Sequence, residues 1–268
     1  MQGYDDELVI FDAEGAAPLP PTGMTGHVEH DNARIWYGLY GAGPLVILLH
    51  GGLGNAGNWG FQVPALIAAG YTALVVDSRG HGRSTRDARP YTYQLLGSDV
   101  LAVMDKLGVA RAAFVGWSDG ACTALILADT HPERVAGVLY FGCNMDRSGT
   151  REFVFTETLG HCISRHKKDY AALSATPDDF DAFSDAVGLM QRTQPNYAAD
   201  DLRRIGVPVT VVQAQNDEFI KHEHAEYLAQ TLPSAELIDL PDVSHFAPLQ
   251  RPDEFNRIML GFAAKVLR

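Results

Sequence analysis

Short apolar runs and longer amphipathic stretches follow one another along the chain. Apolar runs of strand length occupy residues 44–50, 72–77, 112–116, 135–141, 207–213 and 235–240, and extended segments at 26–29 and 33–40 come before them. Runs that are apolar at nearly every position predict strands buried on both faces, and the two earlier segments predict hairpin strands. The chain is therefore expected to build a sheet.

Helical periodicity fills most of the intervals between the apolar runs. Two stretches carry apolar residues on one helical face: Leu96, Val100, Val103 and Leu107 in the first, and Phe255, Ile258, Met259, Phe262 and Val266 in the second. Strands that alternate with such helices predict a mostly parallel sheet covered on both sides. The expected fold class is therefore α/β.

One connection is too long for a simple crossover. Residues 146–200 separate two predicted strands and are rich in charge, histidine and aromatic residues. We interpret this stretch as a small helical cap inserted into a single domain that spans residues 1–268. Its apolar side chains either line an acyl pocket or hold the cap down: Phe153, Phe155, Phe180, Phe183 and Met190.

A serine follows the strand predicted at 112–116. The sequence Gly116-Trp117-Ser118-Asp119-Gly120 leads from this strand into a helix of small residues, which is the pattern of a nucleophile elbow. The sharp turn strains the serine backbone, so the residues two before and two after it must lack side chains. Ser118 is therefore the candidate nucleophile.

A serine nucleophile needs a base and a group that orients the base. Asp217 follows the strand at 207–213, and His245 follows the strand at 235–240, which gives the chain order serine, acid, histidine that this pattern requires. We predict that Asp217 orients His245. Asp146, after the preceding strand, is the main alternative acid, and Asp242 is disfavoured because it lies so close to His245 in the chain.

Backbone amides can hold the negative oxygen of the reaction. The loop His50-Gly51-Gly52-Leu53-Gly54 ends a predicted strand with little side-chain bulk. We expect the amide of Gly52, or less favourably that of Leu53, to form an oxyanion hole with the amide of Asp119.

The same loop also matches a dinucleotide-binding fingerprint. Residues 52–57 read Gly-x-Gly-x-x-Gly, and Asp77 lies about 20 residues further on. This leaves a nicotinamide-dependent oxidoreductase as a remote alternative. His50 before the glycines and the absence of a Tyr-x-x-x-Lys pair disfavour it, and Asp77 with Arg79 is expected to brace a hydrogen-bonded turn.

Taken together, these motifs resemble those of the α/β-hydrolase superfamily from about residue 26 to the C-terminus. The resemblance implies a hydrolase, and such relatives act on esters, enol-lactones, amides or C–C bonds. The elbow is similar to that of small amino-acid-ester hydrolases, in which the acidic residue after the serine faces a substrate ammonium. Asp119 and Trp117 are thus candidate substrate-binding residues. Haloalkane dehalogenases and epoxide hydrolases place aspartate at the elbow, so Ser118 argues against both.

Composition narrows the possible partners. The 268 residues contain 21 Lys and Arg against 33 Asp and Glu, a formal charge of -12, which disfavours nucleic acid and anionic membranes. No secretory leader is evident in residues 1–11, and no apolar run approaches the roughly 18 residues that a membrane span needs. Three cysteines without a C-x-x-C pair suit a reducing cytoplasm. We expect no metal and no cofactor.

A local basic cluster stands out in this acidic chain: His161, Arg165, His166, Lys167 and Lys168. We interpret it as a solvated helix face, with attraction of a carboxylate-bearing substrate as the alternative.

From the sequence we therefore expect a serine hydrolase that cleaves a small carboxylic ester or lactone. Amide or C–C bond hydrolysis on the same residues and a ligand-sensing receptor of the same fold are the alternatives. The sequence does not determine the oligomeric state.

Overall fold

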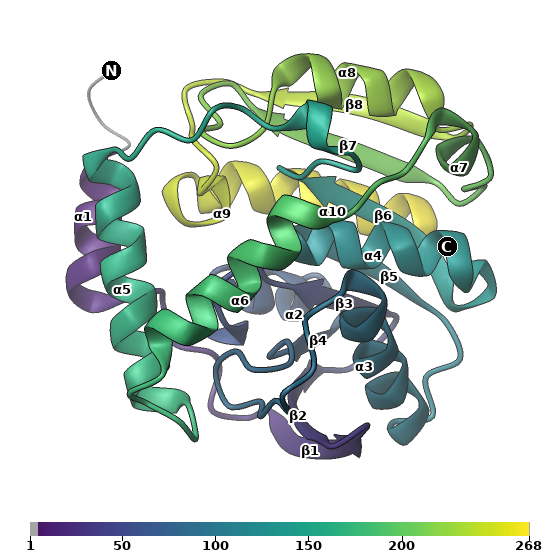
Figure 1. The fold of residues 1–268 in the computed structure, drawn as a ribbon. Helices are drawn as coiled ribbons and strands as arrows, with labels where there is room; N and C mark the ends of the chain where they lie inside the picture. The colour runs from purple at the N-terminus through teal and green to yellow at the C-terminus, as the bar shows by residue number, and fades with distance from the viewer. Residues whose placement is uncertain (1–4, 268) are drawn as a thin grey trace.

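The computed structural model describes residues 5–267, which form one eight-stranded sheet with helices on both sides (Figure 1). The strands are β1 (Met24–His30), β2 (Ala33–Gly41), β3 (Leu45–Leu49), β4 (Thr72–Val76), β5 (Ala112–Trp117), β6 (Val135–Phe141), β7 (Val209–Ala214) and β8 (Ala235–Leu240). The helices are α1 (Asp5–Glu14), α2 (Gln62–Ala68), α3 (Tyr93–Lys106), α4 (Asp119–Thr130), α5 (Glu157–Leu173), α6 (Phe180–Thr193), α7 (Ala199–Arg203), α8 (His222–Thr231), α9 (Ala247–Gln250) and α10 (Pro252–Val266). Three short 3₁₀ turns complete the set: η1 (Ala56–Trp59), η2 (Pro132–Arg134) and η3 (Arg147–Gly149).

The strand order explains where the chemistry can be placed. The sheet runs β1-β2-β4-β3-β5-β6-β7-β8, with β2 antiparallel to both of its neighbours and the remaining pairs parallel. The predicted α/β class with a mostly parallel, doubly covered sheet is confirmed. Parallel strands end at one edge, so the loops after β3, β5, β6, β7 and β8 meet there.

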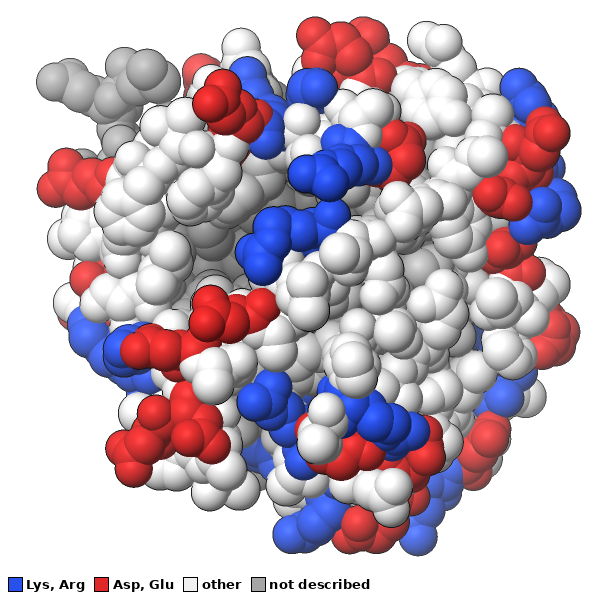
Figure 2. Space-filling view, in the orientation of Figure 1, with Lys and Arg blue, Asp and Glu red and all other residues white. Residues whose placement is uncertain are grey.

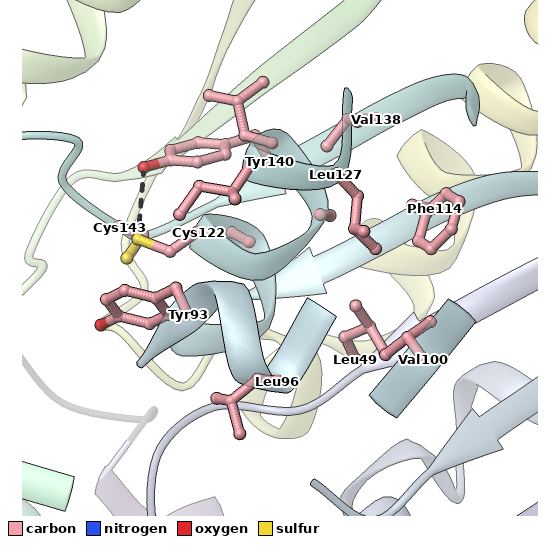
Figure 3. Packing of buried hydrophobic residues seen from close by; sticks show 14 of the residues in the cluster. Leu49, Tyr93, Leu96, Val100, Phe114, Cys122, Leu127, Val138, Tyr140 and Cys143 are labelled. Carbon is pink, nitrogen blue, oxygen red and sulfur yellow. Dashed lines mark hydrogen bonds between the residues drawn. The ribbon is translucent and has the colours of Figure 1, made fainter. Parts of the chain in front are cut away.

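Alternate residues of each central strand face different halves of the core. In β3, Val46 and Leu48 pack in the cluster that includes α2 and α10, whereas Ile47 and Leu49 pack in the cluster of α3, α4 and α8. Figure 3 shows the second cluster, where Val100 of α3 lies near Leu49. Burial on both faces explains why these strands read as unbroken apolar runs.

Two helices of the segment 146–200 lie to one side of the sheet. Helix α5 begins where the Thr156 side chain accepts a hydrogen bond from the Leu159 amide (3.2 Å), and α6 follows it (Figure 1). Phe180, Phe183 and Met190 of α6 are buried, with Phe183 fully enclosed. These side chains therefore hold the helix pair down.

Helix α1 was not predicted. It lies beside α5 (Figure 1) and buries Leu8 and Phe11. Its residues show almost no amphipathic periodicity, so the sequence carries no local signal for it. The prediction about the start of the chain rests partly on residues 1–4, which lie outside the described residues.

The interpretation of the basic cluster as a solvated face holds for the exposed Lys167 and Lys168 and is wrong for the buried His166. Lys168 and His161 both contact Asp12 of α1, at 2.6 and 3.2 Å, and Arg165 pairs with Asp169 at 2.6 Å. Lys167 pairs with Asp181 at 3.2 Å, and His166 is buried. The cluster mostly ties α1 and α5 together, a long-range contact that charge spacing within one segment cannot reveal.

Among residues 5–267, every helix is too short or too polar to cross a bilayer. The three cysteines, Cys122, Cys143 and Cys162, are free and buried.

Candidate active site

Ser118 lies in a strained turn between β5 and α4. Its φ and ψ are 54° and -121°, a conformation that side chains rarely adopt. A Cβ on Gly116 would lie 2.4 Å from the Ala121 Cα, and one on Gly120 would lie 2.1 Å from the Leu49 oxygen. Both positions therefore require glycine, as the elbow pattern predicts.

The structure brings His245 and Asp217 together. His245 Nδ1 lies 2.9 Å from one Asp217 oxygen, and the other oxygen accepts hydrogen bonds from the Phe219 and Ile220 amides, both at 2.9 Å. A carboxylate can only accept, so Nδ1 carries the proton and Nε2 keeps its lone pair. Burial by itself lowers the pKa of His245, but the charge and hydrogen bond of Asp217 outweigh it and raise that pKa.

Neither of the other acid candidates contacts this histidine. Asp146 caps η3, accepts a hydrogen bond from the Ser148 amide (2.8 Å) and lies 3.8 Å from His224. Asp242 occupies a turn with φ of 52°. Of the three candidate acids, Asp217 is the one that contacts His245.

Ser118 and His245 line the same cavity. Among the contacts of residues 5–267, the Ser118 hydroxyl and His245 Nε2 are not joined by a hydrogen bond. Catalytic hydrogen bonds of this kind commonly tighten only when substrate binds.

The loop after β3 packs against the elbow. A Cβ on Gly51 would lie 3.1 Å from the Ser118 Cβ, and one on Gly52 would lie 2.6 Å from an Asp119 carboxylate oxygen. Within the described part of the chain, the amides of Gly52, Leu53 and Asp119 donate to no protein group. This leaves backbone donors beside the serine, and the choice between Gly52 and Leu53 stays a prediction.

Asp119 lies inside the cavity and is held by neutral donors. The Tyr93 hydroxyl donates to one oxygen at 2.8 Å, and the Gln191 amide donates to the other at 3.0 Å. Burial raises the pKa of Asp119, and these two hydrogen bonds oppose that rise. Sequence reasoning missed Tyr93 and Gln191, because they reach Asp119 from distant helices.

Trp117 serves mainly as a support. It is 3% exposed, and its ring packs 6.3 Å from that of His245 and 5.8 Å from that of Phe246, measured between centroids. Its indole nitrogen is buried without a partner. The side chain thus borders the cavity but presents no polar atom to it.

The cavity has a volume of about 560 Å³ and opens at the hollow near the centre of Figure 2. Apolar residues of its wall come from α5, the segment before α5 and the loop after β7: Phe153, Leu159, Cys162, Ile163 and Phe219. Charged residues of the wall include Arg147, Arg151, Arg192 and Glu218. Of the five cap residues proposed from sequence for an acyl pocket, Phe153 is the one that lines this cavity.

Glu218 is a second residue that sequence reasoning missed. It follows Asp217 directly, lines the cavity, and accepts a hydrogen bond from the His245 amide at 3.0 Å. Burial raises the pKa of Glu218, and its negative charge contributes to the raised pKa of His245. The Arg151 side chain donates a hydrogen bond to the Asp217 backbone carbonyl at 2.6 Å and so fixes the loop that carries Asp217 and Glu218.

The dinucleotide fingerprint has a structural explanation. Asp77 is fully buried and accepts hydrogen bonds from the amides of Ala56 (2.7 Å) and Arg83 (2.8 Å), so it braces the glycine loop from within. Arg79 pairs with Asp99 at 2.6 Å, also in the interior. Neither carboxylate is available to a ribose. Groups of three or more metal-binding side chains do not occur among residues 5–267.

The chain is similar to known hydrolases in sequence and in fold. A model described as the alpha/beta hydrolase family matches residues 46–258. Serine hydrolase BPHL of Mus musculus is 25% identical over 95% of this chain and 91% of its own length. Epoxide hydrolase B of Mycobacterium tuberculosis is 43% identical over 99 residues, which cover 36% of this chain and only 28% of that relative. A solved structure of Est816, described as an N-acyl homoserine lactone degrading enzyme, superposes with a TM-score of 0.71 at 30% identity, covering 88% of this chain and all of that one.

Proposed function

The chain belongs to the α/β-hydrolase family, and within it we propose a serine hydrolase that cleaves a small carboxylic ester or lactone. The observation that carries this proposal is Ser118, held in the strained elbow and lining the same cavity as His245, which is in turn paired with the buried Asp217. These are the groups that acyl transfer requires: a nucleophile, a base and an orienting carboxylate.

The geometry supports a two-step reaction. The Ser118 hydroxyl attacks the substrate carbonyl, and His245 Nε2 takes the hydroxyl proton while Asp217 holds the imidazole through Nδ1. The amides of Asp119 and Gly52 (or Leu53) stabilise the negative oxygen. His245 then returns the proton to the leaving alkoxide, and water repeats the sequence to release the acid.

The relatives favour acyl chemistry at a serine. The 30% identical structure is described as degrading a lactone, and one relative that aligns over most of both chains is a serine hydrolase. The epoxide hydrolase matches a shorter segment, and this chain has serine at the elbow position. Amide and C–C bond hydrolysis would use the same residues, so the substrate screen has to include them.

Asp119 is the proposed substrate-binding residue. Its buried carboxylate borders Ser118 and has only neutral partners, Tyr93 and Gln191, so a substrate ammonium or hydroxyl near the scissile bond would give it a further donor. Trp117 is proposed to act indirectly, through its packing against His245.

The test combines labelling with turnover. Wild-type protein is expected to react with a fluorophosphonate probe and to hydrolyse members of a panel of esters, lactones, amides and amino-acid esters. Ser118→Ala should lose both properties, whereas Ser148→Ala, a change at an exposed serine of η3, should keep both. Undiminished ester hydrolysis by Ser118→Ala would reject the assignment. Tight product retention without steady turnover would instead support the receptor alternative.

A further inference from the structure

Three arginines line the cavity without an ion pair, and two of them, Arg147 and Arg192, also make no side-chain hydrogen bond within the described residues; the third, Arg151, donates to the Asp217 carbonyl. Within residues 5–267, the lysine and arginine side chains that make neither a hydrogen bond nor an ion pair are Lys106, Arg147 and Arg192. Arg147 and Arg192 both line the cavity, and Lys106 ends α3 elsewhere. In a protein with 33 acidic residues, unpaired cations concentrated at one cavity indicate a negatively charged ligand.

The acids of the cavity are not available to neutralise these arginines. Asp119 is hydrogen bonded to Tyr93 and Gln191, and Glu218 accepts from the His245 amide. No ion pair joins either carboxylate to Arg147 or Arg192 among the described residues. Both guanidinium groups therefore keep all their donors for a ligand.

The two arginines are exposed residues of the cavity wall and come from different elements. Arg147 belongs to η3, directly after β6, and Arg192 lies in the last turn of α6. The Arg192 guanidinium lies over Gly188, where a Cβ would come within 2.9 Å of it, so the glycine leaves it room. Figure 2 shows Lys and Arg side chains beside the central hollow.

We propose that Arg147 and Arg192 bind a carboxylate carried by the acyl part of the substrate, so that the substrate class is an ester or lactone with a free carboxylate. This inference rests on the proposed function, because the same cavity would hold the scissile bond beside Ser118. Guanidinium groups suit this task because they bind carboxylates through paired hydrogen bonds. The residues differ from the α5 basic cluster, whose charges are paired with acids of the protein.

The test compares two esters that differ in one terminal group. Mono-para-nitrophenyl adipate ends in a carboxylate, and para-nitrophenyl hexanoate ends in a methyl group at the same position. The ratio of kcat/KM for the anionic ester to that for the neutral ester should fall about fivefold in Arg147→Gln and in Arg192→Gln, and further in the double variant. Lys106→Gln removes the third unpaired cation, away from the cavity, and should leave the ratio unchanged.

A binding experiment separates failure of this inference from failure of the proposed function. Calorimetric titration of adipate into Ser118→Ala needs no turnover, and Arg147→Gln or Arg192→Gln in that background should weaken adipate binding about fivefold while Lys106→Gln does not. An unchanged ester ratio together with unchanged adipate binding would overturn the carboxylate site. If wild type hydrolyses neither these esters nor any ester or lactone of the panel, the proposed function fails, and weakened adipate binding would still support the site.

Discussion

Alanine at Gly120 and at Gly261 should have opposite effects on stability. Both glycines lie in helices, α4 and α10, so alanine gains about 1 kcal/mol of helix propensity at either position. At Gly261 nothing lies within 4 Å of the added Cβ. At Gly120 the Cβ would lie 2.1 Å from the Leu49 oxygen, 2.5 Å from the Leu49 carbonyl carbon and 2.8 Å from the His50 oxygen.

The size of the expected stability loss in Gly120→Ala follows from these contacts. The three atoms at Gly120 are backbone atoms of β3 and the following loop, so relief requires a shift of the elbow or of the strand end. Overpacking of this kind costs about 3 kcal/mol at its upper range, which leaves a net loss of about 2 kcal/mol after the helix gain. Gly120→Ala should therefore lower the Tm by roughly 4–8 °C, and Gly261→Ala should raise it by roughly 2–4 °C.

The same shift of the elbow in Gly120→Ala should also lower catalytic activity. Displacement of the elbow by about 1 Å misplaces Ser118 and costs on the order of 100-fold in kcat/KM, whereas Gly261→Ala should keep wild-type activity. Thermal unfolding followed by circular dichroism and hydrolysis of a neutral ester measure both effects. Equal stabilisation by the two substitutions, with unchanged turnover, would show that the Leu49 contact does not constrain the elbow.

Three further outcomes are expected. Asp217→Asn replaces the carboxylate with an amide, whose nitrogen can donate to His245 Nδ1 and favour the wrong tautomer, and should reduce kcat by about 10³- to 10⁴-fold; activity within tenfold of wild type would contradict the pairing. Because His245 must be neutral to act as base and its pKa is raised, the acid limb of the kcat/KM profile should lie above the ordinary histidine pKa. Glu218→Gln removes one of the charges that raise it and should move that limb to lower pH, and an unmoved limb in a pH-rate measurement would refute the coupling. Lys168→Ala should destabilise by at most about 1 kcal/mol in urea unfolding, because the Lys168–Asp12 pair is half exposed on the lysine side; a larger loss would mean that α1 depends on this one contact.

The sequence predicted those features whose causes are local. Buried strands showed as apolar runs, and the elbow showed as two glycines around Ser118, because each of these constraints acts within a few residues. The sequence favoured Asp217 as the acid but left Asp146 as an alternative, since both follow strands that end at the same edge. Only three-dimensional geometry assigns one to His245 and the other to His224.

Features that depend on contacts between distant segments were missed. The hydrogen bonds to Asp119 come from α3 and α6, and no sequence spacing links these helices to the elbow. Helix α1 is stabilised by its contacts with α5 rather than by its own periodicity. The ion pairs of the α5 basic cluster with Asp12 and Asp181 were missed for the same reason.

Helix α6 supplies the Gln191 contact to Asp119 and, one residue later, Arg192 on the cavity wall, while the strand ends supply the nucleophile and its base. Part of the proposed ligand selection thus resides on a helix that carries none of the proposed catalytic groups. Exchange of residues 180–193 for those of another family member offers a way to retarget the protein without rebuilding its reactive centre.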